Sequence, residues 1–177
     1  MKKINFYVLV VFSLFLLSCS SDDDSNPQAD DITLDQVFDG EWNMKSFKNE
    51  LSNSDMNFFQ SVEPIEGTLN SSMLINRSTN EIVIHIEYDG ILTTTFNGDT
   101  EITNVTEERT VALEIVDADF ENETILVSDL DDDLDVIFEI DEYEENYMRF
   151  RGISTDQATY NDQTFVVNST GFFETNR

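Results

Sequence analysis

The chain has 177 residues and carries 37 Asp and Glu against nine Lys and Arg, a formal net charge of −28 at pH 7. This charge argues against binding to nucleic acid or to an anionic membrane surface, because both are negatively charged themselves. The chain is not a disordered polyelectrolyte, since fourteen Phe and five Tyr supply apolar surface for a folded core. Solubility is the default explanation of so much acid, and divalent cations or basic partners are the others.

The N-terminus has the parts of a secretory signal peptide. Lys2 and Lys3 form a positive start, and residues 4–17 are an almost unbroken apolar segment. The segment is too short for a membrane-spanning helix, which needs about 20 apolar residues. It ends at Leu16-Leu17-Ser18-Cys19, and Cys19 is the only cysteine, so no intramolecular disulfide can form.

The four residues that end at Cys19 resemble the lipobox of bacterial lipoproteins. The resemblance implies cleavage before Cys19 and acylation of this residue. The alternative is an ordinary signal peptide with a free cysteine nearby. Cleavage also removes Lys2 and Lys3, which changes the net charge from −28 to −30.

Polar and acidic residues follow the cysteine. Ser20-Ser21-Asp22-Asp23-Asp24 resembles the short export signal of surface-exposed lipoproteins, and the alternative is a solvated spacer. We expect a signal peptide at 1–18, a lipidated cysteine with a flexible acidic tether at 19–31, and one β-domain at 32–177.

The expected domain opens with a helical turn and a strand. Residues 33–38 have capping-box spacing between Thr33 and Gln36, which predicts one helical turn. Residues 41–47 alternate well enough for a first strand that buries Trp42.

The next segment, residues 49–68, is irregular. We expect a loop or a short helix here, with Phe58 and Phe59 folded over an opening. A strand at 68–75 follows.

The clearest strand pattern begins at residue 81. Residues 81–88 alternate apolar and polar side chains, as in a half-buried strand. Asp89-Gly90 and Asn97-Gly98 are dipeptides typical of tight hairpin turns, so we expect a meander with return strands at 91–96 and 99–106.

The alternation continues toward the end of the chain in five further predicted strands, at 109–116, 123–128, 134–140, 147–153 and 163–167. Connections this short favour antiparallel neighbours. The prediction is an all-β fold, an antiparallel up-and-down meander closed into a barrel, with a two-sheet β-sandwich as the alternative and with short helical turns only.

The fragment Asp39-Gly40-Glu41-Trp42 resembles the Gly-x-Trp signature of lipocalins and of lipocalin-like domains on bacterial lipoproteins. The resemblance implies a closed barrel after a short helix, with an arginine of a late strand packed across the Trp ring. Arg149 and Arg151 are the candidates by position, since an arginine over an indole is a favourable cation–π pair. In this family Gly40, Trp42 and the arginine are structural and touch no ligand.

Few residues suggest chemistry. His85, the sole histidine, lies on the polar face of its strand, where a surface role is favoured over a proton shuttle. Residues 129–135 have acids at alternate positions, but Leu134 stands where a calcium loop needs glycine, so an acidic hairpin loop is favoured. We expect no catalytic residue, no metal and no cofactor.

The function that these features favour is small-ligand binding. We expect an outer-membrane lipoprotein that faces the cell exterior, or alternatively the periplasm, and that holds an apolar or amphipathic ligand in the barrel mouth. Its expected partners are the membrane, through the lipid anchor, the ligand and an outer-membrane protein, but not nucleic acid. The alternatives are a structural or interaction lipoprotein without a cavity and, third, a glycan hydrolase with two facing carboxylates.

Overall fold

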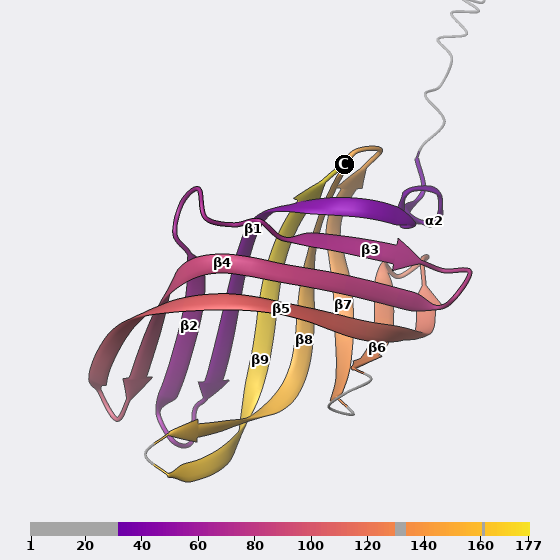
Figure 1. Ribbon diagram of the computed structural model, residues 1–177. Helices are drawn as coiled ribbons and strands as arrows, with labels where there is room; N and C mark the ends of the chain where they lie inside the picture. The colour runs from indigo at the N-terminus through magenta and orange to yellow at the C-terminus, as the bar shows by residue number, and fades with distance from the viewer. Residues whose placement is uncertain (1–31, 130–133, 161) are drawn as a thin grey trace, which may run out of the picture. The chain divides into compact units, whose positions relative to one another are not determined.

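The computed structural model describes residues 32–129, 134–160 and 162–177, which belong to one compact unit, Ile32–Arg177. The predicted signal peptide, Cys19 and the acidic tether lie outside the described residues, as do residues 130–133 of the predicted acidic loop. The unit contains one short helix and nine strands (Figure 1): α2 Leu34–Val37, β1 Gly40–Asn53, β2 Phe58–Pro64, β3 Ser72–Asn76, β4 Glu81–Phe96, β5 Asp99–Asp119, β6 Thr124–Asp129, β7 Leu134–Glu144, β8 Tyr147–Tyr160 and β9 Gln163–Asn176.

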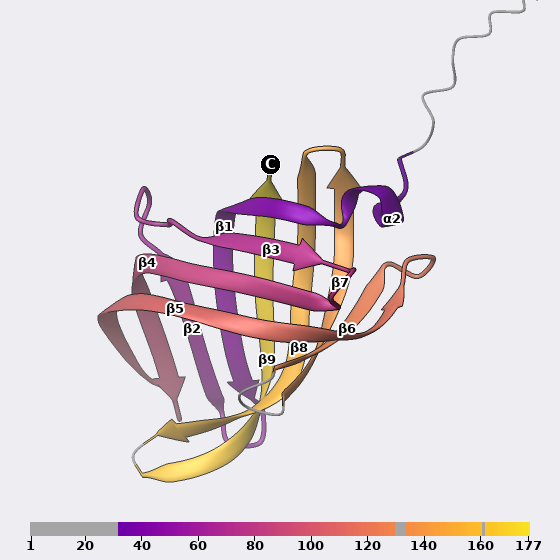
Figure 2. The same cartoon turned by 45° about the vertical axis from the view of Figure 1, so that its right-hand side comes forward.

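All nine strands belong to one antiparallel sheet whose pairings close into a ring (Figures 1 and 2). From β3 to β9 each strand pairs with the next along the chain, and β9 returns to pair with β1 over residues 43–52. β2 and β3 share one position in the ring, since both pair with β1 on one side and β4 on the other. The predicted all-β class and antiparallel up-and-down meander are therefore confirmed.

The ring is uneven because its strands differ in length. β5 has 21 residues and pairs with β6 only at residues 113–119. β8 has 14 residues and pairs with β7 only at residues 147–153. Residues 99–112 of β5 and 154–160 of β8 therefore pair with a described strand on one side only.

One apolar core lies inside the ring, between the strands and α2. Its most buried side chains, with no exposed surface, are Trp42, Ile82, Ile125, Val127 and Met148. Burial of such side chains stabilises a fold by roughly 25 cal/mol per Å² of apolar surface. The strand pairings and the buried core lie within Ile32–Arg177, so this segment contains the interactions that fold it.

Two local predictions are confirmed. α2 forms where the capping-box spacing predicts a helical turn, and the Thr33 backbone N–H donates to Gln36 Oε1 at 3.1 Å. Asn97 and Gly98 adopt φ angles of +52° and +93° and join β4 to β5 as a tight hairpin. No helix in the described ranges is long and apolar enough to cross a membrane, and α2 has only four residues.

The predicted turn at Asp89-Gly90 is wrong, because β4 runs through it without a break and Gly90 has no positive φ. A Cβ atom on Gly90 would lie 2.7 Å from Tyr88 Cε2 and 2.9 Å from the Glu63 carbonyl oxygen. Glycine is needed here for space beside the Tyr88 ring, not for a turn. β5 is likewise one strand where two were expected.

The predicted loop or helix at 49–68 is also wrong. β1 continues to Asn53 and forms a hairpin with β2. Phe58 is 3% exposed and packs edge-on against Phe165 at a centroid distance of 4.8 Å, whereas Phe59 alternates to the outer face and is 38% exposed. The two phenylalanines therefore form no lid over an opening.

Candidate functional site

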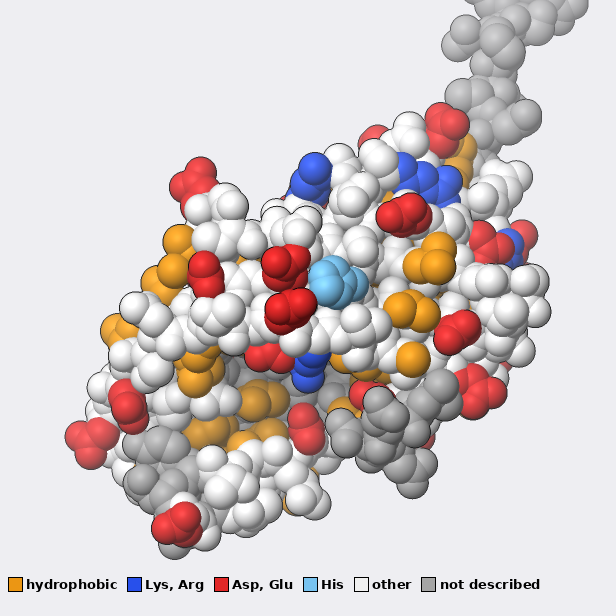
Figure 3. Space-filling view, in the orientation of Figure 1, with side chains coloured by type: hydrophobic (Ala, Val, Ile, Leu, Met, Phe, Trp, Pro, Cys, Tyr) orange, Lys and Arg blue, Asp and Glu red, His pale blue; other side chains and the backbone are white. Residues whose placement is uncertain are grey.

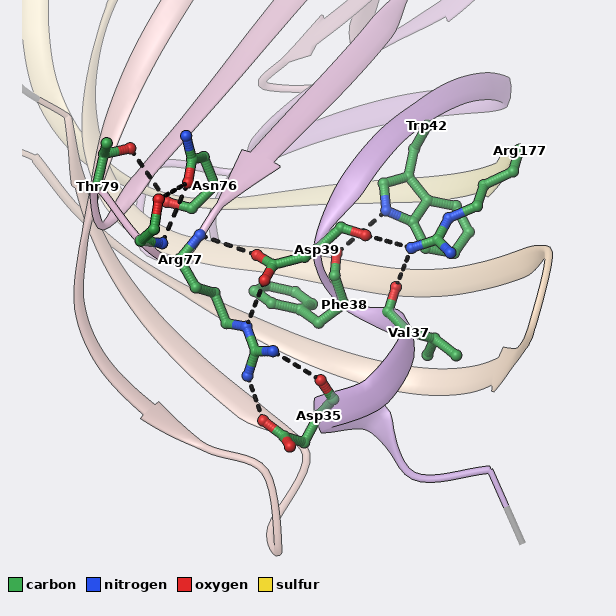
Figure 4. A network of polar contacts seen from close by, with 10 residues as sticks. Asp35, Val37, Phe38, Asp39, Trp42, Asn76, Arg77, Thr79 and Arg177 are labelled. Carbon is green, nitrogen blue, oxygen red and sulfur yellow. Dashed lines mark hydrogen bonds and ion pairs between the residues drawn. The ribbon is translucent and has the colours of Figure 1, made fainter. Parts of the chain in front are cut away.

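The α2 end of the ring is closed by Trp42 and Arg177 (Figure 4). Trp42 opens β1 and is fully buried, and Arg177 follows the last residue of β9. The guanidinium carbon of Arg177 lies 4.4 Å from the centroid of the Trp42 ring, a cation–π contact. This end, which we call the base, joins the first and last long strands of the sheet.

The same two side chains satisfy the backbone where α2 turns into β1. The Trp42 indole Nε1–H donates to the Phe38 carbonyl oxygen at 3.2 Å. Arg177 donates to the Val37 carbonyl oxygen at 2.5 Å and to the Asp39 carbonyl oxygen. Three consecutive carbonyl groups at the end of a short helix, which have few partners of their own, are thus hydrogen-bonded to side chains.

Gly40 makes this closure possible. Its φ of +122° is one that side chains rarely tolerate, and a Cβ atom there would lie 3.3 Å from an Arg177 nitrogen. The conformation requires glycine, and a side chain would also crowd the Arg177 guanidinium, which explains the glycine two residues before Trp42.

A second arginine fixes α2 from the other side (Figure 4). The Arg77 backbone N–H and Nε both donate to the Asp39 carboxylate, at 2.8 and 3.0 Å, and its guanidinium also binds Asp35. Burial acts to lower the pKa of Arg77, but the hydrogen bonds to Asp35 and Asp39 outweigh burial and raise the pKa. Arg77 also lies 5.3 Å from the Phe120 ring centroid.

The arginine over Trp42 is therefore Arg177, and the candidates Arg149 and Arg151 are wrong for this contact. Arg149 pairs with Glu142 at 3.2 Å, and its side chain is 51% exposed. Arg151 pairs with Glu139 at 2.9 Å and with Asp141 at 3.2 Å. Both are surface ion pairs across β7 and β8.

The interior away from the base contains a cavity of about 200 Å³. Its apolar walls come from β4, β5 and β7: Ile84, Ile86, Val111, Leu113, Leu134 and Val136. Figure 3 shows the cavity as a hollow on the face toward the viewer, with apolar side chains visible inside it.

Aromatic rings form the floor of the cavity. Phe47, Phe138 and Phe173 line it, and Phe150 packs beneath them. Phe150 stacks on Phe173 at a centroid distance of 4.7 Å and meets Phe138 at 5.1 Å, while Phe47 lies 5.4 Å from Phe173. Rings at these distances attract one another beyond simple burial, so the floor is a preorganised apolar surface.

A pair of glycines contributes to the hollow. Gly152 of β8 and Gly171 of β9 are directly opposite each other in the sheet, and both line the cavity. A Cβ atom on Gly152 would lie 3.1 Å from the Phe138 ring, and one on Gly171 would lie 2.7 Å from the Phe173 ring. The missing side chains therefore give the floor rings their positions.

Polar side chains complete the lining: Asn49, Arg109, Asp129, Ser154, Asp156 and Ser169. Arg109 is the one cation among the lining residues, and its Nε lies 3.2 Å from Glu107 Oε1. On the neighbouring strand burial raises the pKa of Tyr88, the charge of Glu107 raises it further, and Arg109 lowers it. Tyr88 is therefore a neutral phenol at physiological pH.

His85 lies outside this site. It alternates with Ile84 and Ile86, which line the cavity, and its ring contacts Thr110 at 3.4 Å and Glu87 at 3.7 Å. This position agrees with the predicted polar face of the strand.

Sequence reasoning missed most of the lining. Arg109 could have been found, because it shares its face with Val111 and Leu113, which the alternation predicted to be buried. Gly152 and Gly171 carried no such signal, since a strand glycine does not reveal which residue lies opposite.

Comparisons with known proteins identified no relative of this chain. No family model matches the chain, and neither a curated protein nor a solved structure matches it.

We predict that Arg177→Ala lowers the free energy of unfolding by about 1–3 kcal/mol, through loss of the cation–π contact and of two charge-assisted hydrogen bonds. Arg149→Ala is the matched control and should change stability by less than about 0.5 kcal/mol, because it removes one exposed ion pair. Urea unfolding followed by Trp42 fluorescence measures both. Equal effects of the two substitutions would contradict the role given to Arg177.

Proposed function

We propose that the chain is a lipoprotein, anchored through Cys19 to the outer membrane and facing the cell exterior, whose lipocalin-like domain binds a small apolar or amphipathic ligand without catalysing a reaction. The observation that carries the ligand-binding part is the cavity of about 200 Å³ with an aromatic floor and apolar walls. Such a hollow, with a few polar groups that converge on it, is the usual form of a small-molecule site.

The size of the cavity limits the ligand. Its volume of about 200 Å³ is below the roughly 300–1,000 Å³ of sites for drug-sized molecules. About seven water molecules, at roughly 30 Å³ each in the liquid, occupy the same volume. The proposed ligand is therefore small, or inserts only its apolar end.

The polar lining suits the other end of an amphipathic molecule. Asn49, Ser154 and Ser169 offer neutral donors and acceptors beside the apolar walls. Arg109 is paired with Glu107 at 3.2 Å and its side chain is 59% exposed, so its charge is also screened by solvent. A neutral polar head can therefore form hydrogen bonds to Asn49, Ser154 and Ser169.

The anchoring part of the proposal is supported by the sequence. The lipobox resemblance at Cys19 and the acidic residues after it motivate attachment to the outer membrane and display on its outer side. One acyl chain of myristoyl length binds a membrane only marginally, and a second makes the attachment stable.

A glycan hydrolase is the alternative with a specific observation in its favour, since Asp129 and Asp156 both line the cavity. Two carboxylates across a groove are what such a reaction needs. Hydrolysis of a glycan by the protein, and its loss in Asp156→Asn, would replace our proposal with this one.

We predict that Ser169→Phe weakens binding of the neutral dye N-phenyl-1-naphthylamine by at least about tenfold, because the new ring occupies the cavity. Asn168→Phe is the matched control, since Asn168 precedes Ser169 in β9, is exposed and does not line the cavity. Fluorescence titration of the Ile32–Arg177 segment, with 1-octanol as competitor, measures the effect. Absence of saturable dye binding, or equal weakening by both substitutions, would refute the ligand site.

We predict that cells fed labelled palmitate incorporate the label into the chain and that Cys19→Ser abolishes the incorporation, because acylation needs the thiol of Cys19. The Cys19→Ser protein should also leave the membrane fraction after mild washing. Ser20→Ala serves as the control and should keep both label and membrane attachment. A labelled Cys19→Ser chain would exclude this anchor.

A further inference from the structure

The open side of β5 is the longest unpaired strand edge in the described ranges. Residues 99–112 pair with β4 along one side, while β6 begins its pairing only at Leu113. The open side therefore has 14 residues, against seven for residues 154–160 of β8. Figures 1 and 2 show no labelled strand alongside this part of β5 on the side away from β4. An edge of this kind presents unpaired N–H and C=O groups that can pair with another chain.

The composition of this edge favours strand pairing. Seven of its 14 residues are Thr, Ile or Val, which suit extended backbone, and it contains no Gly, Pro or Lys. The β-bulge of β5 lies beyond it, between Ile115 and Asp117. Bulges and prolines prevent many edges from pairing, and residues 99–112 have neither, so charged side chains are the protection that this edge has.

Charge determines which chain can pair with the edge. Four acids and one base give residues 99–112 a net charge of −3, from Asp99, Glu101, Glu107, Glu108 and Arg109. Two such edges repel each other, and the acidic residues 20–31 are repelled as well. A basic segment is attracted to the edge, whereas a second copy of the edge and residues 20–31 are repelled by their like charge.

We infer that the open side of β5 binds a basic, extended segment of another protein, which adds to the sheet as a further strand. Backbone hydrogen bonds hold the added strand, and its Lys or Arg side chains pair with the acids of the edge. Apolar residues of the segment cover Ile102, which is 69% exposed in the described structure. This inference does not rest on the proposed ligand, although the edge shares Arg109 and Val111 with the cavity lining.

The test uses the Ile32–Arg177 segment and a labelled ten-residue peptide of alternating Lys and Val. Two control peptides have the same length: one carries N-methyl groups on alternate amides, and the other has Glu in place of Lys. Fluorescence anisotropy measures binding, and amide hydrogen exchange locates it. We expect the basic peptide to bind and to slow exchange within residues 99–112, and we expect neither control to bind.

A pair of double variants tests the role of the edge acids. Glu101→Gln with Glu108→Gln removes two charges from the edge, and Glu66→Gln with Glu145→Gln removes two from exposed turn positions elsewhere. The edge variant should bind the basic peptide about threefold to tenfold more weakly, as expected for the loss of two exposed ion pairs, and the other variant should bind it unchanged.

Three outcomes would overturn the inference. Equal binding of the N-methylated peptide would show attraction by charge without strand addition. Failure of the basic peptide to bind would show that the edge accepts no partner of this kind. A dimer of the segment in analytical ultracentrifugation, dissociated by the peptide, would show that a second copy of this chain is the occupant.

Discussion

The closure of β9 onto β1, completed by Arg177 over Trp42, is the constraint on which the rest of the structure depends. β1 and β9 are distant in sequence, yet they pair over residues 43–52. The residue after β9 donates hydrogen bonds to carbonyl groups of the last residue of α2 and of Asp39. One guanidinium thus joins the start and the end of the ring, and a buried indole gives it a surface to stack on. Because the pairing, the stacking and the hydrogen bonds need one another, we expect the base to unfold as a unit.

The two ends of the ring differ in how tightly their interior is packed. The base is packed with large side chains, whereas two opposed glycines and a floor of phenylalanines leave a cavity beyond it. The short β6 has a similar effect on the wall, because it covers only the last seven residues of β5. The packed base and the cavity therefore lie at different ends of one sheet.

Local features were predictable from the sequence, and long-range ones were not. The Asn97-Gly98 turn and the helical turn at Thr33 follow from backbone preferences of a few residues, and both are confirmed. Asp89-Gly90 has the same kind of turn sequence, but Gly90 is required because a side chain there would collide with the Tyr88 ring. The dipeptide alone does not reveal this spatial requirement. The choice of Arg177 over Arg149 depends on the register between β9 and β1, and the cavity depends on which residues face Gly152 and Gly171 across strands. Alternation within single strands predicts buried faces but not these partners.

Native-state hydrogen exchange tests the central claim most directly. If the β1–β9 closure holds the fold together, the backbone amides that pair residues 43–52 with β9 and the indole N–H of Trp42 should exchange only through global unfolding, with the full free energy of unfolding. Amides on the open side of residues 99–112 should exchange through local opening at much lower free energy. Exchange of the β1–β9 amides as fast as that of the open edge of β5 would contradict the account.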